Sequence, residues 1–333
     1  MKQKTGAAVA LLSATTVALL LGPRLDPGTQ DLATTLLVYL AIAQAWNILS
    51  GFAGQVSLGA ATFVAAGGYA AGLALAHTPV DWPAGVALAV LVSCAIGAAL
   101  AVPLLRLRGD YFAIGTLAAS IAVQALLTNW NWAGGAAGVT LPIDRIPTGT
   151  VLFELAAFVA ATAMALAVYV RYSAFGLRLT AIRDNEPAAA GLGVAVYRHR
   201  FAALVLSSAL TGMAGAVTAY QYVAVSPGGM ASVNWSLNAV LMALVGGAGS
   251  VLGPVLGVVV VYYGLTRQLE DFQVVSLVVE GVLLVLIVKF APAGIWSLLT
   301  RAGRAIRGRL LGAPGSAPAT PEAEPTAREI EVV

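Results

Sequence analysis

The chain is poor in charge and nearly free of cysteine. Only 10% of its 333 residues are Asp, Glu, Lys or Arg, whereas a soluble globular domain carries about 25%. So few charges cannot cover a soluble fold of this length, but a surface that faces lipid requires that charge be rare. The one cysteine, Cys94, excludes a disulfide within a single chain and leaves the redox compartment open. We interpret Cys94 as a small packing residue within an apolar stretch.

The sequence also lacks the usual signals of an enzyme. It holds two histidines, His77 and His199, both in polar connections, and no Cys/His pair or metal-ligand spacing. The glycine-rich run at 246–253 lacks the Lys-Ser/Thr pair of a phosphate-binding loop. We therefore predict that the chain is not an enzyme, binds no metal or cofactor itself and does not hydrolyse ATP alone. A net charge of +3 is too small to suggest nucleic acid.

Long apolar stretches are what the chain has in abundance. Hydrophobic residues make up 59% of it, and its mean hydropathy is +0.87. About 20 apolar residues cross a bilayer as a helix, which pairs its own backbone groups. A barrel would show short alternating segments instead. We predict an all-α, polytopic transmembrane helical bundle with about eight to ten spans, by the length rule.

The predicted spans are separated by polar or glycine-rich breaks. Lys2 and Lys4 precede the first apolar run, and the Gly22-Pro23-Arg24 that follows it does not resemble a cleavage site, so we expect that helix to be retained. We assign residues 1–310 to a transmembrane domain and the Pro/Ala/Glu-rich residues 311–333 to a disordered cytoplasmic tail. The predicted apolar stretches cover residues 6–21, 32–49, 60–76, 84–105, 111–127, 152–170, 201–223, 237–265 and 274–290.

The distribution of arginine predicts the orientation in the membrane. By the positive-inside rule the N-terminus and the arginine-containing connections belong in the cytoplasm, and both termini lie on that side. This assignment is self-consistent if residues 237–265 enter the membrane and return, each limb being too short for a full span. Such short, glycine-interrupted limbs indicate backbone that lines a cavity. The cytoplasmic connections are 106–110, 171–200 and 301–309, and the outer ones are 77–83, 128–150 and 226–235.

Two glycine-rich breaks resemble each other. One reads G-F-A-G-Q-V-S-L-G from Gly51, and the other reads G-G-A-G-S-V-L-G from Gly246. Either they mark an internal repeat, or they reflect how common glycine is in packed membrane helices. We predict that the breaks line a translocation pathway whose polar but uncharged groups suit a zwitterion or a neutral amide. The predicted pathway residues are Asn47, Gly51, Gly54, Gln55, Ser57, Gly59, Gly246, Gly247, Gly249 and Gly253.

A carboxylate also lies inside a predicted span. Glu280 is within the last apolar stretch, and an intramembrane acid is by default a hypothesis of function. It is either a coupling site or a hydrogen-bonded group at a helix contact.

The longest internal polar segment contains signals for a short helix. Asp184, Asn185 and Glu186 suit the start of a helix, Pro187 suits its first turn, and Gly191 or Gly193 can end it. We interpret residues 181–191 as a rigid docking element on the cytoplasmic face, in preference to a plain loop.

Here the sequence resembles a family. The acid–Pro–Ala–Ala–Ala–Gly pattern is similar to the coupling ("EAA-type") loop of bacterial ABC importers. Four segments, in order, are similar to branched-chain amino acid permeases of the LivM type and extend the resemblance over roughly residues 30–297. They are N-I-L-S-G-F-A-G-Q at 47–55, R-L-R-G-D-Y-F-A-I at 106–114, G-G-A-A-G-V at 134–139 and G-G-A-G-S-V-L-G-P-V-L-G at 246–257. Ala136 and Ala137 depart from the family's usual pair in the third segment.

The resemblance implies partners and a mechanism. The chain would be a permease subunit in a bacterial cytoplasmic (inner) membrane, paired with a second homologous permease. Two ATP-binding subunits would hold ATP-Mg and drive transport, and a periplasmic or lipid-anchored substrate-binding protein would deliver branched-chain, hydrophobic amino acids. The predicted ATPase-coupling residues are Arg183, Asp184, Glu186, Pro187, Ala188, Ala189 and Gly191.

Other functions stay open at this point. The same importer class could carry urea, short amides or small carboxylates, because the binding protein does most of the selecting. A stand-alone secondary transporter would use Glu280 as its coupling site. An intramembrane enzyme is disfavoured, because no catalytic constellation is present.

Overall fold

The computed structural model describes residues 26–266 and, beyond them, residues 278–279, 281–283, 285–286, 289 and 294–296. The predicted first helix at 6–21, Glu280 and the predicted tail at 311–333 lie outside the described residues, so the predictions about them stay untested. The described residues are mainly helical, as predicted. Seven helical segments among them are long and apolar enough to cross a membrane.

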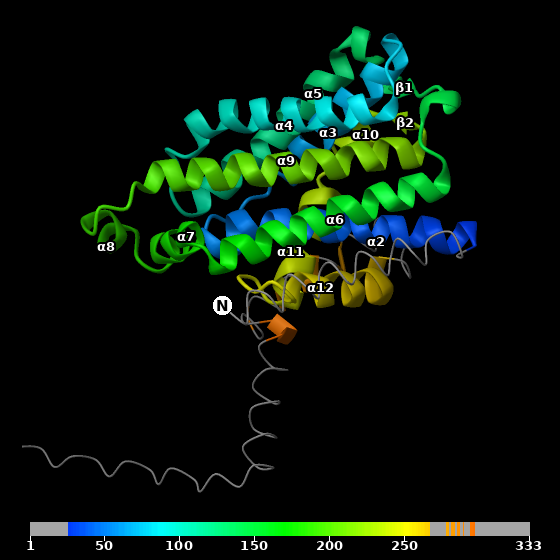
Figure 1. Cartoon of the computed structure of the whole chain (residues 1–333). Coiled ribbons are helices and arrows are strands. Elements are labelled where there is room, and N and C mark those ends of the chain that lie inside the picture. The colour runs from blue at the N-terminus through cyan, green and yellow to red at the C-terminus, as the bar shows by residue number, and fades with distance from the viewer. Residues whose placement is uncertain are drawn as a thin grey trace, which may run out of the picture. The chain divides into compact units, whose positions relative to one another are not determined.

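The helices follow the predicted order (Figure 1). The long ones are α2 (Pro27–Trp46), α3 (Ala60–His77), α4 (Trp82–Leu104), α5 (Asp110–Asn129), α6 (Gly149–Tyr172) and α9 (Val196–Tyr222). The shorter ones are α7 (Ala174–Asp184), α8 (Glu186–Gly191), α10 (Pro227–Met230), α11 (Asn234–Gly246) and α12 (Gly253–Val261). α2 continues into the π-helix η2 (Asn47–Phe52), and α12 into the π-helix η6 (Tyr262–Thr266).

Polar side chains cap the N-terminal ends of α2, α7 and α8. The Asp26 carboxylate accepts hydrogen bonds from the backbone N–H and the hydroxyl of Thr29 at the start of α2. These bonds hold the pKa of Asp26 below its usual value, because they favour the charged form. Ser173 caps α7 by accepting from Gly176 N, and Asn185 caps α8 by accepting from Ala188 N.

Small residues let α9 pack closely between its neighbours. A Cβ on Gly67 of α3 would collide with the backbone of Gly212, and one on Gly215 of α9 would collide with the backbone of Val64. On the other side of α9, a Cβ on Gly97 of α4 would lie 2.8 Å from Cβ of Ser208. Small residues at helix contacts are how membrane helices approach without a hydrophobic driving force. α9 therefore joins α3 and α4 to α2 and α6 (Figure 1).

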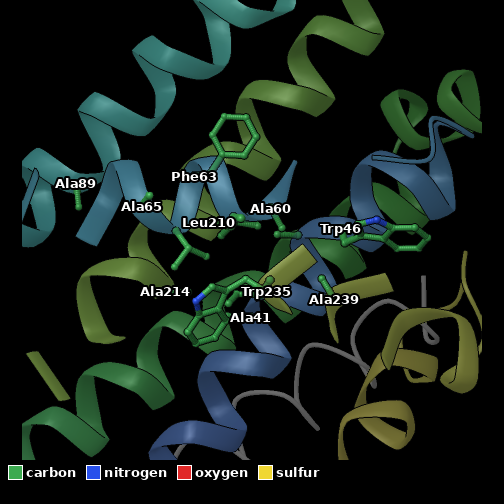
Figure 2. Close-up of a cluster of buried hydrophobic side chains, with 14 of the residues drawn as sticks. Ala41, Trp46, Ala60, Phe63, Ala65, Ala89, Leu210, Ala214, Trp235 and Ala239 are labelled. Atoms are coloured by element: carbon green, nitrogen blue, oxygen red, sulfur yellow. The ribbon is translucent and has the colours of Figure 1, made fainter. Parts of the chain in front are cut away.

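One hydrophobic cluster connects the central helices. Figure 2 shows side chains of α2, α3, α4, α9 and α11 in this cluster, many of them alanines around Trp235 and Leu210. Trp235 is 8% exposed, and its ring centroid lies 5.3 Å from that of Tyr39 in α2. The cluster holds the end of α2 and the start of α11, and the two predicted breaks follow the C-terminal ends of these helices.

The outer helices have the surface expected against lipid. Only 28% of the residues in the most apolar stretch of α4 and 22% of those in α5 are buried, against 78% in α3. Large apolar side chains such as Leu91 and Ile114 are more than 60% exposed. An exposed apolar surface of this kind is what a membrane-facing helix requires.

The predicted outer connection contains a small element of sheet. β1 (Val139–Thr140) pairs antiparallel with β2 (Ala224–Val225), with Val139 opposite Val225. Gly138 has φ +77°, and a Cβ there would collide with the Val225 carbonyl, so this connection lies tightly on the end of α9. In the part of the chain that the structure describes, the fold is therefore an all-α bundle with one two-residue strand pair, which the sequence did not predict.

Candidate functional site

The two glycine-rich breaks meet inside the bundle. The first follows α2 through η2 and runs to Gly59, and the second is residues 247–252 between α11 and α12. A Cβ on Gly51 would lie 2.6 Å from the backbone N of Gly249, so neither break leaves room for a side chain at this contact. The sequence predicted both interruptions, and the structure brings them together; whether they form an internal repeat stays a prediction.

Asn47 holds the second break against the first. Its Oδ1 accepts from Gly249 N at 2.7 Å, and its Nδ2 donates to Ser250 O at 2.8 Å. The side chain is fully buried. A buried amide that satisfies one backbone N–H and one backbone C=O is expensive to remove. Asn47 is thus the central side chain of the contact.

Gln44 extends this contact by one helical turn. Its Nε2 donates to Val251 O at 2.6 Å, and its Oε1 accepts from Asn47 Nδ2 at 3.3 Å. Gln44 was not among the predicted pathway residues. The sequence feature that could have identified Gln44 is its position as an uncharged polar residue three positions before Asn47, on the same face of a mainly apolar helix.

Serines close the first break on itself. Ser50 Oγ donates to Gln55 O at 2.7 Å, and Ser57 Oγ accepts from Gly59 N at 3.1 Å. Trp46 Nε1 donates to Ser57 O at 2.8 Å. The chain therefore leaves the helix without abandoning buried backbone groups, as irregular backbone at membrane depth requires.

The second break supplies mainly backbone. Gly247 has φ +119° and Gly249 φ +78°, conformations that favour glycine. Ser250 Oγ donates to Gly247 O at 2.7 Å and accepts from Gly253 N at 2.9 Å. A Cβ on Gly246 would collide with the backbone of Gly253, so α11 and α12 leave the break as a tight pair. α10 and α11 together (Pro227–Gly246) are long enough to cross a membrane, so the prediction that both limbs are too short for a full span is wrong for the first limb.

Arg183, at the end of α7, reaches this junction from the predicted cytoplasmic face. Its Nη1 donates to Gly51 O at 2.8 Å, across 132 positions of sequence. Asp184 Oδ1 accepts from Arg183 Nε at 3.0 Å and lies 3.0 Å from Nη2. Arg183 was predicted to lie in an ATPase groove, but in this chain its side chain points toward the first break.

The other predicted coupling residues surround the short helix α8. Glu186 forms an ion pair with Arg200 of α9 at 2.8 Å, and Ala189 is 2% exposed, so one side of α8 is fixed. The remaining predicted residues, Pro187, Ala188 and Gly191, are exposed. The predicted set therefore separates into the exposed Arg183, which contacts the first break, an anchored side of α8 and a free face of small residues. The sequence missed the ion pair with Arg200 and the interruption at Asn185, which divides the predicted helix at 181–191 between the end of α7 and α8.

The predicted pathway residues form a closed contact in this structure. Gln55 and Ser57 are 6% and 4% exposed, and Gln55 Oε1 is buried without a hydrogen-bond partner. Gly54 is exposed beside Arg183, while Gly59 packs on Thr116. Within the described ranges, no three His, Cys, Asp or Glu side chains gather as a metal site would need. The expectation that the chain binds no cofactor stays a prediction.

Seven helical segments among the described residues are long and apolar enough to cross a membrane, the seventh being α10 and α11 together (Pro227–Gly246). With the two interrupted segments that meet at this junction, they define a multi-pass membrane protein. Comparison with known sequences supplies the family. The model of the family described as "Branched-chain amino acid transport system / permease component" matches residues 28–288. The chain belongs to this family of permeases.

Individual relatives agree with this assignment. The chain is 30% identical to the high-affinity branched-chain amino acid transport system permease protein LivM of Salmonella typhimurium, over 80% of the chain and 70% of the relative. It is 29% identical to LivM of Escherichia coli over the same shares. The nucleoside ABC transporter permease protein NupC of Lactococcus lactis is 33% identical over 51% of the chain and 57% of the relative. No solved structure matches the chain.

Proposed function

We propose that the chain is the membrane-spanning permease subunit of an ABC importer that carries branched-chain, hydrophobic amino acids across a bacterial cytoplasmic (inner) membrane. It pairs with a second homologous permease and receives its cargo from a periplasmic or lipid-anchored binding protein. Two separate ATPase subunits bind ATP-Mg and drive the cycle. The family and the LivM relatives, whose names carry this substrate and this role, support the proposal.

The free face of α8 is the structural observation that carries the proposal. α8 offers Pro187, Ala188 and Gly191 to solvent, while the Glu186–Arg200 ion pair and buried Ala189 hold its other side. A held helix with a small, exposed face can enter a groove on a partner without first becoming ordered, which lowers the cost of binding.

The charges around α7 and α8 support a cytoplasmic position for this face. Arg171 at the end of α6, Arg178 in the middle of α7 and Arg198 at the start of α9 are exposed. An excess of arginine in short connections marks the cytoplasmic side of a membrane protein. On this orientation the strand pair β1–β2 lies outside, and both termini are in the cytoplasm.

The paired breaks support a pathway for an uncharged or zwitterionic cargo. Asn47, Gln44 and Ser57 bring amide and hydroxyl groups into the interior at the point where two helices are interrupted. Transporters commonly form their substrate sites where helices are interrupted. We propose that the pathway opens where the two breaks now close against each other.

Docking is tested by changing the free face of α8. The variant Ala188→Arg places a long cation on that face, and Ala136→Arg places the same cation on an exposed site of the predicted outer connection. Co-purification with candidate ATPase subunits should fall at least tenfold for Ala188→Arg and stay at the wild-type level for Ala136→Arg. Equal recovery of the ATPases with all three proteins would refute docking through α8.

The cargo is tested by uptake into vesicles that contain the complex and its binding protein. Leucine, isoleucine and valine should be imported in an ATP-dependent manner and should compete with one another. Import of nucleosides, urea, short amides or small carboxylates in place of these amino acids would replace the proposed cargo. Uptake by the chain alone, without an ATPase and sensitive to Glu280→Gln, would instead show a stand-alone transporter.

A further inference from the structure

We infer that Arg183 is a positioning residue that joins α7 to the paired breaks, so that the cytoplasmic helices and the junction in the membrane move as one body. This inference rests on the proposed function, because it assigns the route by which movement of α8 reaches the pathway. It concerns a single side chain that bonds to backbone far away in the sequence.

The bond made by Arg183 depends on the shape of the first break. Gly51 belongs to η2, where the α-helical pattern of hydrogen bonds is replaced by a wider one. π-helical turns leave backbone groups available and frequently occur at functional sites. The Gly51 carbonyl accepts from Arg183 Nη1 at 2.8 Å, so the interrupted helix presents a specific acceptor to the cytoplasmic segment.

Two glycines make room for the arginine. A Cβ on Gly54 would lie 2.5 Å from Cγ and 2.9 Å from Cβ of Arg183, and one on Gly249 would lie 3.0 Å from Arg183 Nη1. Both glycines have positive φ, +73° and +78°. One of them belongs to each break, so the arginine lies against both at once. A purely external docking residue would require neither contact.

Asp184 and the start of α7 orient the arginine from the other side. The Asp184 carboxylate contacts Nε and Nη2 of Arg183, which leaves Nη1 directed at Gly51. At its first turn α7 is held by the Ser173 cap, and a Cβ on Gly176 would collide with the Val170 carbonyl at the end of α6. α7 is therefore fixed at both ends and transmits displacement instead of absorbing it.

α8 follows α7 after a single residue, Asn185, whose side chain caps α8. A partner that pushes α8 therefore moves the end of α7, where Arg183 donates its hydrogen bond to the first break. Asn47 in turn ties the second break to the first. The contacts form a continuous chain from the exposed face of α8 to both interrupted helices.

The test measures coupling in the full complex reconstituted in vesicles. For each variant we would record assembly with the ATPases, basal ATP hydrolysis and the number of ATP molecules hydrolysed per cargo molecule imported. Arg183→Gln should assemble and hydrolyse ATP normally but raise that ratio at least tenfold, and Arg183→Lys should raise it less. Arg171→Gln, which removes an exposed guanidinium at the end of α6, should leave the ratio unchanged.

Several results would overturn the inference. An unchanged ratio in Arg183→Gln would show that the contact is not used. Loss of assembly in Arg183→Gln alone would show that this residue serves docking instead. If the wild-type chain neither assembles with ATPases nor imports cargo, the proposed function itself fails. Failure of the inference is distinguishable from this outcome, because each variant is compared with a wild type that assembles and imports cargo.

A tether distinguishes joint movement from a contact that must open. Disulfide Cβ atoms lie about 3.5–4.5 Å apart, so in Gly54→Cys with Arg183→Cys the two Cβ positions, 2.9 Å apart, must separate slightly and the new residue at position 54 must accept φ +73°. With Cys94→Ala as background, the oxidised pair should import more cargo per ATP than the same protein after reduction. Lower import in the oxidised form would contradict movement as one body.

Discussion

The two breaks have similar sequences but different constructions. The first places Asn47, Ser50 and Ser57 inside the bundle, and these side chains bond to backbone of both breaks. The second contributes backbone at Gly249 and Ser250, and its own serine only closes the loop locally. One break therefore supplies side chains, and the other supplies bare N–H and C=O groups.

This difference explains why the breaks can lie against each other. Two side-chain-rich loops would clash in the interior, and two bare loops would leave backbone groups unpaired, which is costly away from water. A complementary pair avoids both penalties. It also means that the two breaks should be sensitive to opposite changes. Removal of a side chain should disrupt the first break, and addition of a side chain should disrupt the second.

Removal of the Asn47 side chain should have the largest effect. Asn47→Ala leaves the partly buried Gly249 N and Ser250 O without their side-chain partner, at an expected cost of about 1–3 kcal/mol. Asn129→Ala is the matched control, because this exposed amide bonds only to Ala125 O one turn away. Thermal unfolding in detergent, followed by tryptophan fluorescence, measures both. Equal midpoints for the two variants would remove Asn47 from the centre of the contact.

A side chain in the second break should have the next largest effect. Gly249→Ala forces φ +78° on a residue with a Cβ, which costs about 1–2 kcal/mol, and brings that Cβ to 3.2 Å from Gly51 O. Gly228→Ala is the control, since a Cβ there meets no atom within 4 Å. The same unfolding assay should show a lower midpoint only for Gly249→Ala. A stable Gly249→Ala would mean that the breaks are not in close contact.

The smallest effect is expected at the N-terminal end of α2, where the Asp26 carboxylate caps the helix. The pKa of Asp26 is lowered by its bonds to Thr29, so its stabilising effect is present above the ordinary carboxyl pKa and is lost as the pH falls through the lowered value. The side chain is fully exposed, so the effect is small. The midpoint difference between wild type and Asp26→Ala should shrink from pH 6 to roughly pH 3. Asp81→Ala is the control, because its side chain makes no capping bond in α4.

The sequence predicted the elements better than their contacts. Apolar length located six of the seven span-length segments within five residues, but the seventh, Pro227–Gly246, begins in the predicted outer connection at 226–235. Glycine clusters located both breaks, because these signals are local. The N-cap at Asn185 and Pro187 in the first turn correctly located α8. The predicted helix at 181–191 included the end of α7, but the first seven residues of α7, 174–180, were not predicted to be helical.

The contacts of the site could not be predicted from one sequence. The bond from Asn47 to Gly249 joins positions 202 apart, and no local pattern specifies such a pair. Arg183 is one of several arginines in its segment, and its inward direction depends on room left by Gly54 in another part of the chain. Packing of distant segments decides both, whereas propensity and periodicity decide only the elements.

The most direct test of the paired breaks is amide hydrogen exchange of residues 247–252, measured by mass spectrometry in wild type and in Asn47→Ala. The Gly249 N–H donates to Asn47 Oδ1 at 2.7 Å, so wild type should exchange slowly in this peptide. Asn47→Ala should speed that exchange at least tenfold while peptides of α3 and α9 stay unchanged. Equal exchange of residues 247–252 in the two proteins would contradict a junction held by Asn47.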